Sequence, residues 1–166
     1  MIQTEPSIHS QALISALKLA KKGAFEEARA AVADIEPESL PTDELRKFAL
    51  IHSYCGRESE AEQAWESICS RPDVRIGDWF MLGATQADLG RAEPAIGNFQ
   101  RELAAAIAQK DERYLSAAVI HLAFLLATAG RREEALDVLK HIDDSESIYV
   151  QGAGVMSKPD LLAMLG

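Results

Sequence analysis

The chain repeats one short pattern four times: a glycine is followed five residues later by an alanine. The four pairs are Gly23 and Ala28, Gly56 and Ala61, Gly90 and Ala95, and Gly130 and Ala135. Successive glycines are 33, 34 and 40 residues apart. A repeat of this length is typical of proteins that stack supersecondary units, because each unit must share a core with its neighbours to bury its apolar face. The spacing therefore predicts an array of repeated units.

The third copy carries a fuller pattern that identifies the unit. It contains Trp79, Leu82 and Gly83, followed by Ala95 and Phe99, which is the arrangement W-x2-L-G and then A-x3-F. This pattern resembles the tetratricopeptide repeat, a hairpin of two helices. The resemblance extends over about residues 8–143. It implies an all-α fold, a right-handed superhelical array of about four helical hairpins.

Every copy has a small residue where Gly83 stands in the third. The four residues are Ala16, Ala49, Gly83 and Ala123. Two helices approach closely only if a facing position carries almost no side chain. We therefore expect Gly83 to lie at the tightest contact of its hairpin.

Apolar periodicity, glycines and prolines set the expected helix boundaries. We expect helices at about residues 8–22, 25–35, 43–55, 58–70, 78–89, 91–110, 113–129 and 132–141. Ser7, after Pro6, is expected to cap the first helix, and Thr42 the third. The sixth helix is the longest, which accounts for the 40-residue spacing after Gly90.

The chain is expected to have three parts, an N-terminal arm at residues 1–7, a repeat region at 8–144 and a tail at 145–166. In the tail, residues 148–150 are strand-like, Gly152 and Gly154 are flexible, and Ser157 is expected to cap a short last helix. The exposed flank of a terminal repeat must be covered. We expect the tail to fold back across the last hairpin, cover this flank and partly occupy the groove described below.

The composition is acidic, with a net charge of −9 and a pI of about 4.9. Such a surface repels phosphate backbones and anionic membranes, so we expect no nucleic-acid or membrane partner. No apolar stretch reaches the length of a membrane span, and the N-terminus lacks the features of a secretory leader. Cys55 and Cys69 are expected to be buried, reduced thiols. We therefore expect a cytoplasmic protein, and a homo-oligomer is compatible with its sequence.

The sequence offers little that indicates catalysis. Its four histidines are scattered, and none lies at the i, i+4 spacing of a helical metal site. Gly152 and Gly154 resemble part of a dinucleotide-binding loop, but Ser157 stands where the third glycine belongs. We therefore expect no catalytic residue, cofactor or metal. An enzyme or nucleotide binder that uses the Gly152–Gly154 loop is a remote alternative.

Function is expected on the concave groove, which the first helix of each hairpin lines in the family that this chain resembles. The matching positions are Leu13, Leu17, Lys21, Asp43, Arg46, Leu50, Tyr54, Phe80, Ala84, Asp88, Ile120, Phe124 and Thr128. Several are large and apolar, which suits an amphipathic helix or an apolar peptide of another protein. Family members that bind heat-shock chaperones carry a lysine and asparagine clamp where this chain has Leu13 and Leu17, so that activity is disfavoured.

We therefore predict a protein-interaction module, an adaptor or chaperone-like protein that binds a hydrophobic or helical segment of a partner. The alternative is a regulatory partner that neutralises a basic protein through its acidic outer face. Charge pairing of that kind weakens with added salt, whereas binding in an apolar groove does not.

Overall fold

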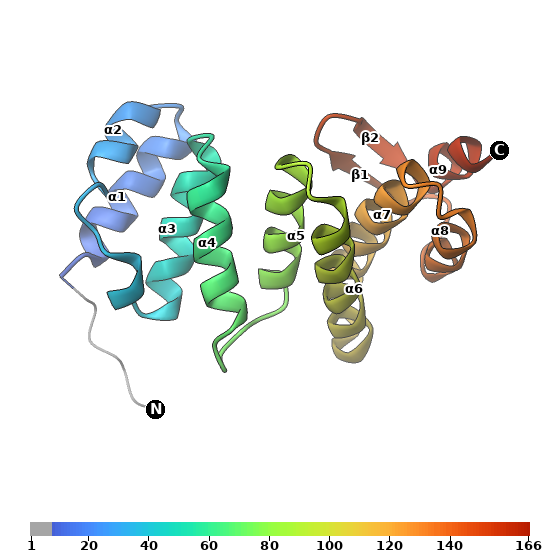
Figure 1. The fold of residues 1–166 in the computed structure, drawn as a ribbon, viewed down its shortest axis with the longest axis horizontal. Helices are drawn as coiled ribbons and strands as arrows, with labels where there is room; N and C mark the ends of the chain where they lie inside the picture. Colours follow the sequence, from blue (N-terminus) through green and yellow to red (C-terminus); the bar gives the residue numbers. More distant parts are fainter. Residues whose placement is uncertain (1–7) are drawn as a thin grey trace. The chain divides into compact units, whose positions relative to one another are not determined.

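The computed structural model describes residues 8–166, and this part of the chain is mostly helical (Figure 1). It contains nine α-helices and one two-stranded sheet within the described residues. The chain forms two compact units that divide between Val74 and Arg75. A mostly helical fold was predicted and is confirmed. The expected N-terminal arm at residues 1–7, with the proposed Ser7 cap, lies outside the described residues.

The first unit pairs its helices in sequence order. They are α1 (Ser10–Lys21), α2 (Phe25–Ala30), α3 (Thr42–Tyr54) and α4 (Glu58–Cys69), with a 3-10 turn at Pro37–Ser39. α1 packs against α2 and α3, and α3 packs against α4. Ala16 and Ala49, two of the small residues expected at close helix contacts, are completely buried.

Two local predictions for the first unit are wrong. α2 ends at Ala30, earlier than predicted, because the chain tightens into turns in which the Val32 amide donates to the Arg29 carbonyl three residues back. Thr42 is the first residue of α3 and not its cap. Its hydroxyl instead donates to Asp73 Oδ1 over 2.9 Å and ties the start of α3 to the end of the unit.

The second unit is built around one central helix. Its elements are α5 (Asp78–Asp88), α6 (Ala92–Gln109), α7 (Glu112–Thr128), α8 (Arg132–Val138), a 3-10 turn (Leu139–His141), β1 (Ser147–Val150), β2 (Gly154–Ser157) and α9 (Lys158–Leu165). α7 packs against α6, α8, α9 and β1, and α5 packs against α6. The long sixth helix that the sequence predicts is present as α6, which has 18 residues.

Gly83 lies at a close contact between α5 and α6. A Cβ atom at this position would stand 3.2 Å from Phe99 Cε1 and 3.3 Å from the carbonyl oxygen of Ala95. Both partners belong to the A-x3-F part of the pattern. The close contact predicted at Gly83 is confirmed, and it fixes how α5 lies on α6.

A buried carboxylate caps the N-terminus of α5. Glu102 of α6 is 0% exposed. Its Oε1 accepts a hydrogen bond from the Gly77 amide at a distance of 2.7 Å, and its Oε2 accepts one from the Phe80 amide at 3.3 Å. The first amides of a helix have no partner inside the helix, and a carboxylate also suits the positive end of the helix dipole. Burial raises the pKa of Glu102 above its usual value, while the two amide hydrogen bonds oppose this shift.

The tail folds onto α7. β1 and β2 form an antiparallel hairpin in which Tyr149 lies opposite Val155. Leu161 and Leu165 of α9 are buried in the same apolar core as α7. α9 thus packs on α7, the first helix of the predicted last hairpin.

The start of α9 also agrees with prediction. Ser157 and Asp160 form a reciprocal capping box, in which the Ser157 amide donates to Asp160 Oδ2 over 2.9 Å. The second strand, β2, was not predicted, because Gly152 and Gly154 suggested flexibility. In the structure both glycines have positive φ angles, 78° and 85°, and they shape the turn between the strands. The loop thus joins two strands, whereas a dinucleotide-binding loop leads from a strand into a helix.

Candidate functional site

The groove positions predicted in the first unit have different environments. Leu13 is 0% exposed and packs in the core, so its assignment to an open groove is wrong. Three of the predicted positions are half-buried: Leu17, Arg46 and Leu50. The remaining three are exposed: Lys21, Asp43 and Tyr54. The Arg46 guanidinium donates to Asp43 Oδ1 over 2.8 Å and to the Asp73 carbonyl over 2.9 Å.

In the second unit, the structure brings four predicted residues to one pocket: Phe80, Ala84, Asp88 and Phe124. Ile120 is 0% exposed, so its placement in the groove is wrong. It is buried because α7 is covered by neighbours on several sides. Thr128 is exposed at the end of α7, outside the pocket, and its hydroxyl donates to the Leu125 carbonyl over 2.9 Å.

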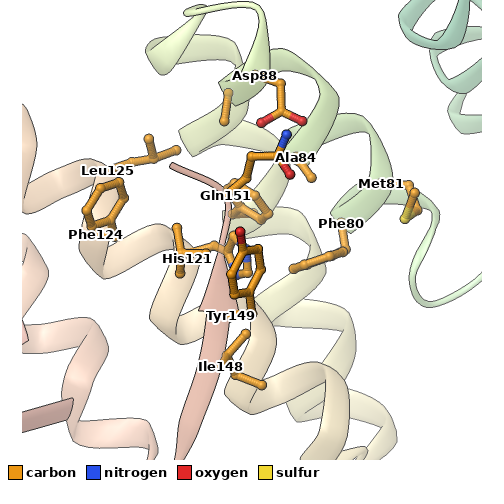
Figure 2. Close-up of a pocket in the computed structure, with 13 residues that line it drawn as sticks. Phe80, Met81, Ala84, Asp88, His121, Phe124, Leu125, Ile148, Tyr149 and Gln151 are labelled. Carbon is orange, nitrogen blue, oxygen red and sulfur yellow. The ribbon is translucent and has the colours of Figure 1, made fainter. Parts of the chain in front are cut away.

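The pocket has a volume of about 360 Å³ and lies between α5, α7 and the first strand of the tail (Figure 2). Its lining consists of Phe80, Met81, Ala84, Ala87, Asp88, Phe99, His121, Phe124, Leu125, Ile148, Tyr149, Val150 and Gln151. Most of these side chains are apolar. A pocket of this size is at the lower end of the range for sites that hold small ligands, and it can equally take one large side chain of another protein.

Three aromatic rings pack against one another in the pocket. The ring centroid of His121 is 4.9 Å from that of Phe80, at an interplanar angle of 85°, and 5.4 Å from that of Phe99. Phe80 and Phe99 meet edge to face at 5.4 Å. Such tilted and edge-to-face contacts are the favoured geometry for aromatic pairs. The three rings therefore hold one another in a defined orientation.

His121 is the one imidazole among the residues that line the pocket. Its Nδ1 lies 2.9 Å from the carbonyl oxygen of Ala117, one turn earlier on α7. Burial lowers the pKa of His121, and the bond to Ala117 partly opposes this shift. The ring is thus neutral at neutral pH, and the contact with a carbonyl places its single proton on Nδ1. Nε2 then carries a lone pair and acts as an acceptor.

Replacing His121 by phenylalanine should reduce the loss of stability in acid. The folded-state pKa is lowered below about 6.5, the usual value, so the unfolded chain binds a proton more readily than the folded one. The contribution of His121 to stability is complete above about pH 6.5 and is lost as the pH falls towards the folded-state pKa.

Urea unfolding at pH 7.5 and pH 5.5 measures this effect. The phenylalanine variant should lose less stability between the two pH values than the parent protein, although some loss should persist because burial also lowers the pKa of His52. Equal losses in the two proteins would contradict the prediction.

One wall of the pocket comes from the tail and was missed as a binding surface. Ile148, Tyr149, Val150 and Gln151 all line the pocket, and in Figure 2 β1 crosses it while the amide of Gln151 points towards Asp88. The apolar triplet 148–150 was the available signal, and it indicated only that the tail would fold back. The structure adds that the tail shapes the pocket and leaves it open.

The pocket lining contains one acid and one imidazole. The acid, Asp88, lies beside the Gln151 amide in Figure 2, and the imidazole, His121, packs against Phe80 and Phe99. Elsewhere in residues 8–166, no three His, Cys, Asp or Glu side chains gather to hold a metal ion. None of the helices in the described residues has the length and apolarity needed to cross a membrane. Comparison with protein-family models and with curated protein sequences found no match to this chain.

Proposed function

We propose that the chain is a tetratricopeptide-like protein-interaction module and that the pocket of the second unit binds an apolar side chain from a segment of a partner protein. The observation that carries this proposal is the open, aromatic-lined pocket formed by Phe80, Phe124 and the tail. Burial of one large apolar side chain contributes about 1.5–3 kcal/mol, enough to anchor a peptide that makes further contacts outside the pocket.

The packing of the second unit supports a relationship to tetratricopeptide repeats. Gly83 of the W-x2-L-G pattern lies against Ala95 and Phe99 of the A-x3-F pattern, across the contact between α5 and α6. Eight of the thirteen lining residues come from α5 and α7, each the first helix of its hairpin. In the family that the sequence resembles, these helices face the concave groove where peptides bind.

Site-directed photo-cross-linking tests the proposal. A benzophenone amino acid at Met81, a half-buried residue of the pocket lining, should capture a partner segment from a cytosolic extract. The same amino acid at Glu133, which is exposed on α8, serves as the control. Capture of an apolar peptide at residue 81 but not at 133 would support the proposal. Equal labelling at both positions, or no protein captured at residue 81, would contradict it.

Filling the pocket should remove binding without unfolding the protein. Ala84 is half-buried in the lining, so Ala84→Trp places a large ring in the space that the partner side chain would occupy. We expect at least about a tenfold loss of affinity for the captured segment, since about 1.5–3 kcal/mol of apolar burial is displaced. The measurement is a binding titration combined with thermal unfolding.

Ala104→Trp is the matched control, because Ala104 is exposed on α6 and does not line the pocket. This variant should bind as the parent does. If Ala84→Trp binds with unchanged affinity while its melting temperature is preserved, the pocket is not the binding site.

A further inference from the structure

The pocket contains an acceptor that no part of the described chain satisfies. His121 Nδ1 is occupied by the Ala117 carbonyl, 2.9 Å away. Nε2 is consequently the acceptor of the ring, and no residue among 8–166 donates a hydrogen bond to it. Nε2 is not among the buried atoms without a partner, so water can reach it in the open pocket. A ligand that displaces this water leaves the acceptor unpaired unless it brings a donor of its own, so a ligand with a donor is favoured.

The direction of Nε2 follows from the packing of the ring. Because Nδ1 turns back to its own helix, Nε2 on the other side of the ring points away from α7. Phe80 and Phe99 contact the ring at 4.9 Å and 5.4 Å between centroids and hold it in place. Figure 2 shows His121 between Phe80 and Phe124, behind Tyr149, within the pocket. The acceptor is therefore presented to whatever enters.

We propose that the side chain bound in the pocket is a tryptophan of the partner protein, and that its indole N–H donates to Nε2 of His121. This inference rests on the proposed function and specifies its ligand. The pocket volume of about 360 Å³ provides room for a large aromatic ring. The rings of Phe80, Phe124 and Tyr149 supply aromatic surface for contact with the indole.

Other side chains fit this chemistry less well. Leucine and phenylalanine leave Nε2 unpaired. Lysine and arginine could donate to Nε2 and pair with Asp88, but neither brings a wide apolar ring to lie against Phe80, Phe124 and Tyr149, and their charged ends are costly to desolvate. Tyrosine supplies a donor, but its hydroxyl also has lone pairs that would need partners in an apolar pocket. The indole N–H donates only, so tryptophan leaves no polar atom unsatisfied.

Two small probes isolate the hydrogen bond. Indole and indene have the same fused-ring shape, and indene has a CH2 group where indole has its N–H. Each is titrated into the full chain and followed by NMR. Indole should bind about threefold to tenfold more tightly than indene, which corresponds to one neutral hydrogen bond. In His121→Phe, which keeps an aromatic ring at this position, both probes should bind with similar affinity.

The outcomes separate this inference from the proposed function. Equal affinities of indole and indene for the parent protein, or a preference for indole that persists in His121→Phe, would overturn the inference. Failure of both probes to bind the parent would overturn it as well. A partner segment captured at residue 81 that lacks tryptophan would reject the tryptophan assignment and leave the interaction module standing. Capture of a tryptophan-containing segment whose Trp→Phe variant binds more weakly would support both.

Discussion

Gly83→Arg should unfold the second unit or leave it severely destabilised. The Cβ atom alone would lie 3.2 Å from Phe99 Cε1 and 3.3 Å from the Ala95 carbonyl oxygen, and the rest of the side chain has to pass through this contact. Overpacking a core costs about 1–3 kcal/mol, and burying an unpaired charge adds more. A loss of this size is a large share of the stability of a small domain.

Gly97→Arg provides the matched control on α6. A Cβ atom at Gly97 would meet nothing within 4 Å. Arginine also has a higher helix propensity than glycine, by roughly 0.5–1 kcal/mol, so this variant should melt at the same temperature as the parent or slightly higher. Thermal unfolding by circular dichroism compares the two variants. If Gly83→Arg melts like the parent, α5 does not pack on α6 through this glycine.

Leu161→Ala should be the second strongly destabilising substitution. Leu161 is 0% exposed and lies in the core that α7 and α9 share. Truncating a fully buried leucine to alanine typically lowers the free energy of unfolding by about 2–5 kcal/mol. Apolar burial is lost, and the surrounding residues fill only part of the cavity that remains. Urea unfolding should show a lower midpoint.

Leu162→Ala is the control for this substitution. Leu162 is the next residue of the same helix but is 39% exposed, so its truncation removes much less buried surface. We expect a change of less than about 1 kcal/mol. If the two variants are equally stable, α9 contributes little to the core, and the tail is only loosely attached to the unit.

Features that depend on neighbouring residues in the sequence were predictable. The glycine at the end of each first helix, the length of α6 and the capping box of Ser157 and Asp160 all follow from local backbone and side-chain chemistry. The contact between Gly83 and Phe99 could also be predicted, because the repeat pattern places a small and a large residue where the two helices meet.

Features that depend on residues far apart in the sequence were missed. Glu102 caps α5 through the amide of Gly77, 25 positions earlier, and no local pattern marks such a pair. The burial of Ile120 depends on how many elements surround α7, which periodicity alone does not reveal. The contribution of His121 to the pocket was hidden for the same reason. A lone histidine on an apolar helix becomes informative only when the partner of each ring nitrogen is known.

Under the proposed function, the tail wall of the pocket links partner binding thermodynamically to docking of the tail. Ile148 and Tyr149 line the pocket, while Leu161 of the same tail packs in the core beside α7. A partner that contacts this wall stabilises the docked tail, and reciprocity requires that a firmly docked tail raises the affinity for the partner by the same factor. Substitutions that loosen the packing of α9 should therefore weaken partner binding, although α9 does not line the pocket. They would do so by lowering the fraction of molecules whose tail is docked, without removing a contact to the partner.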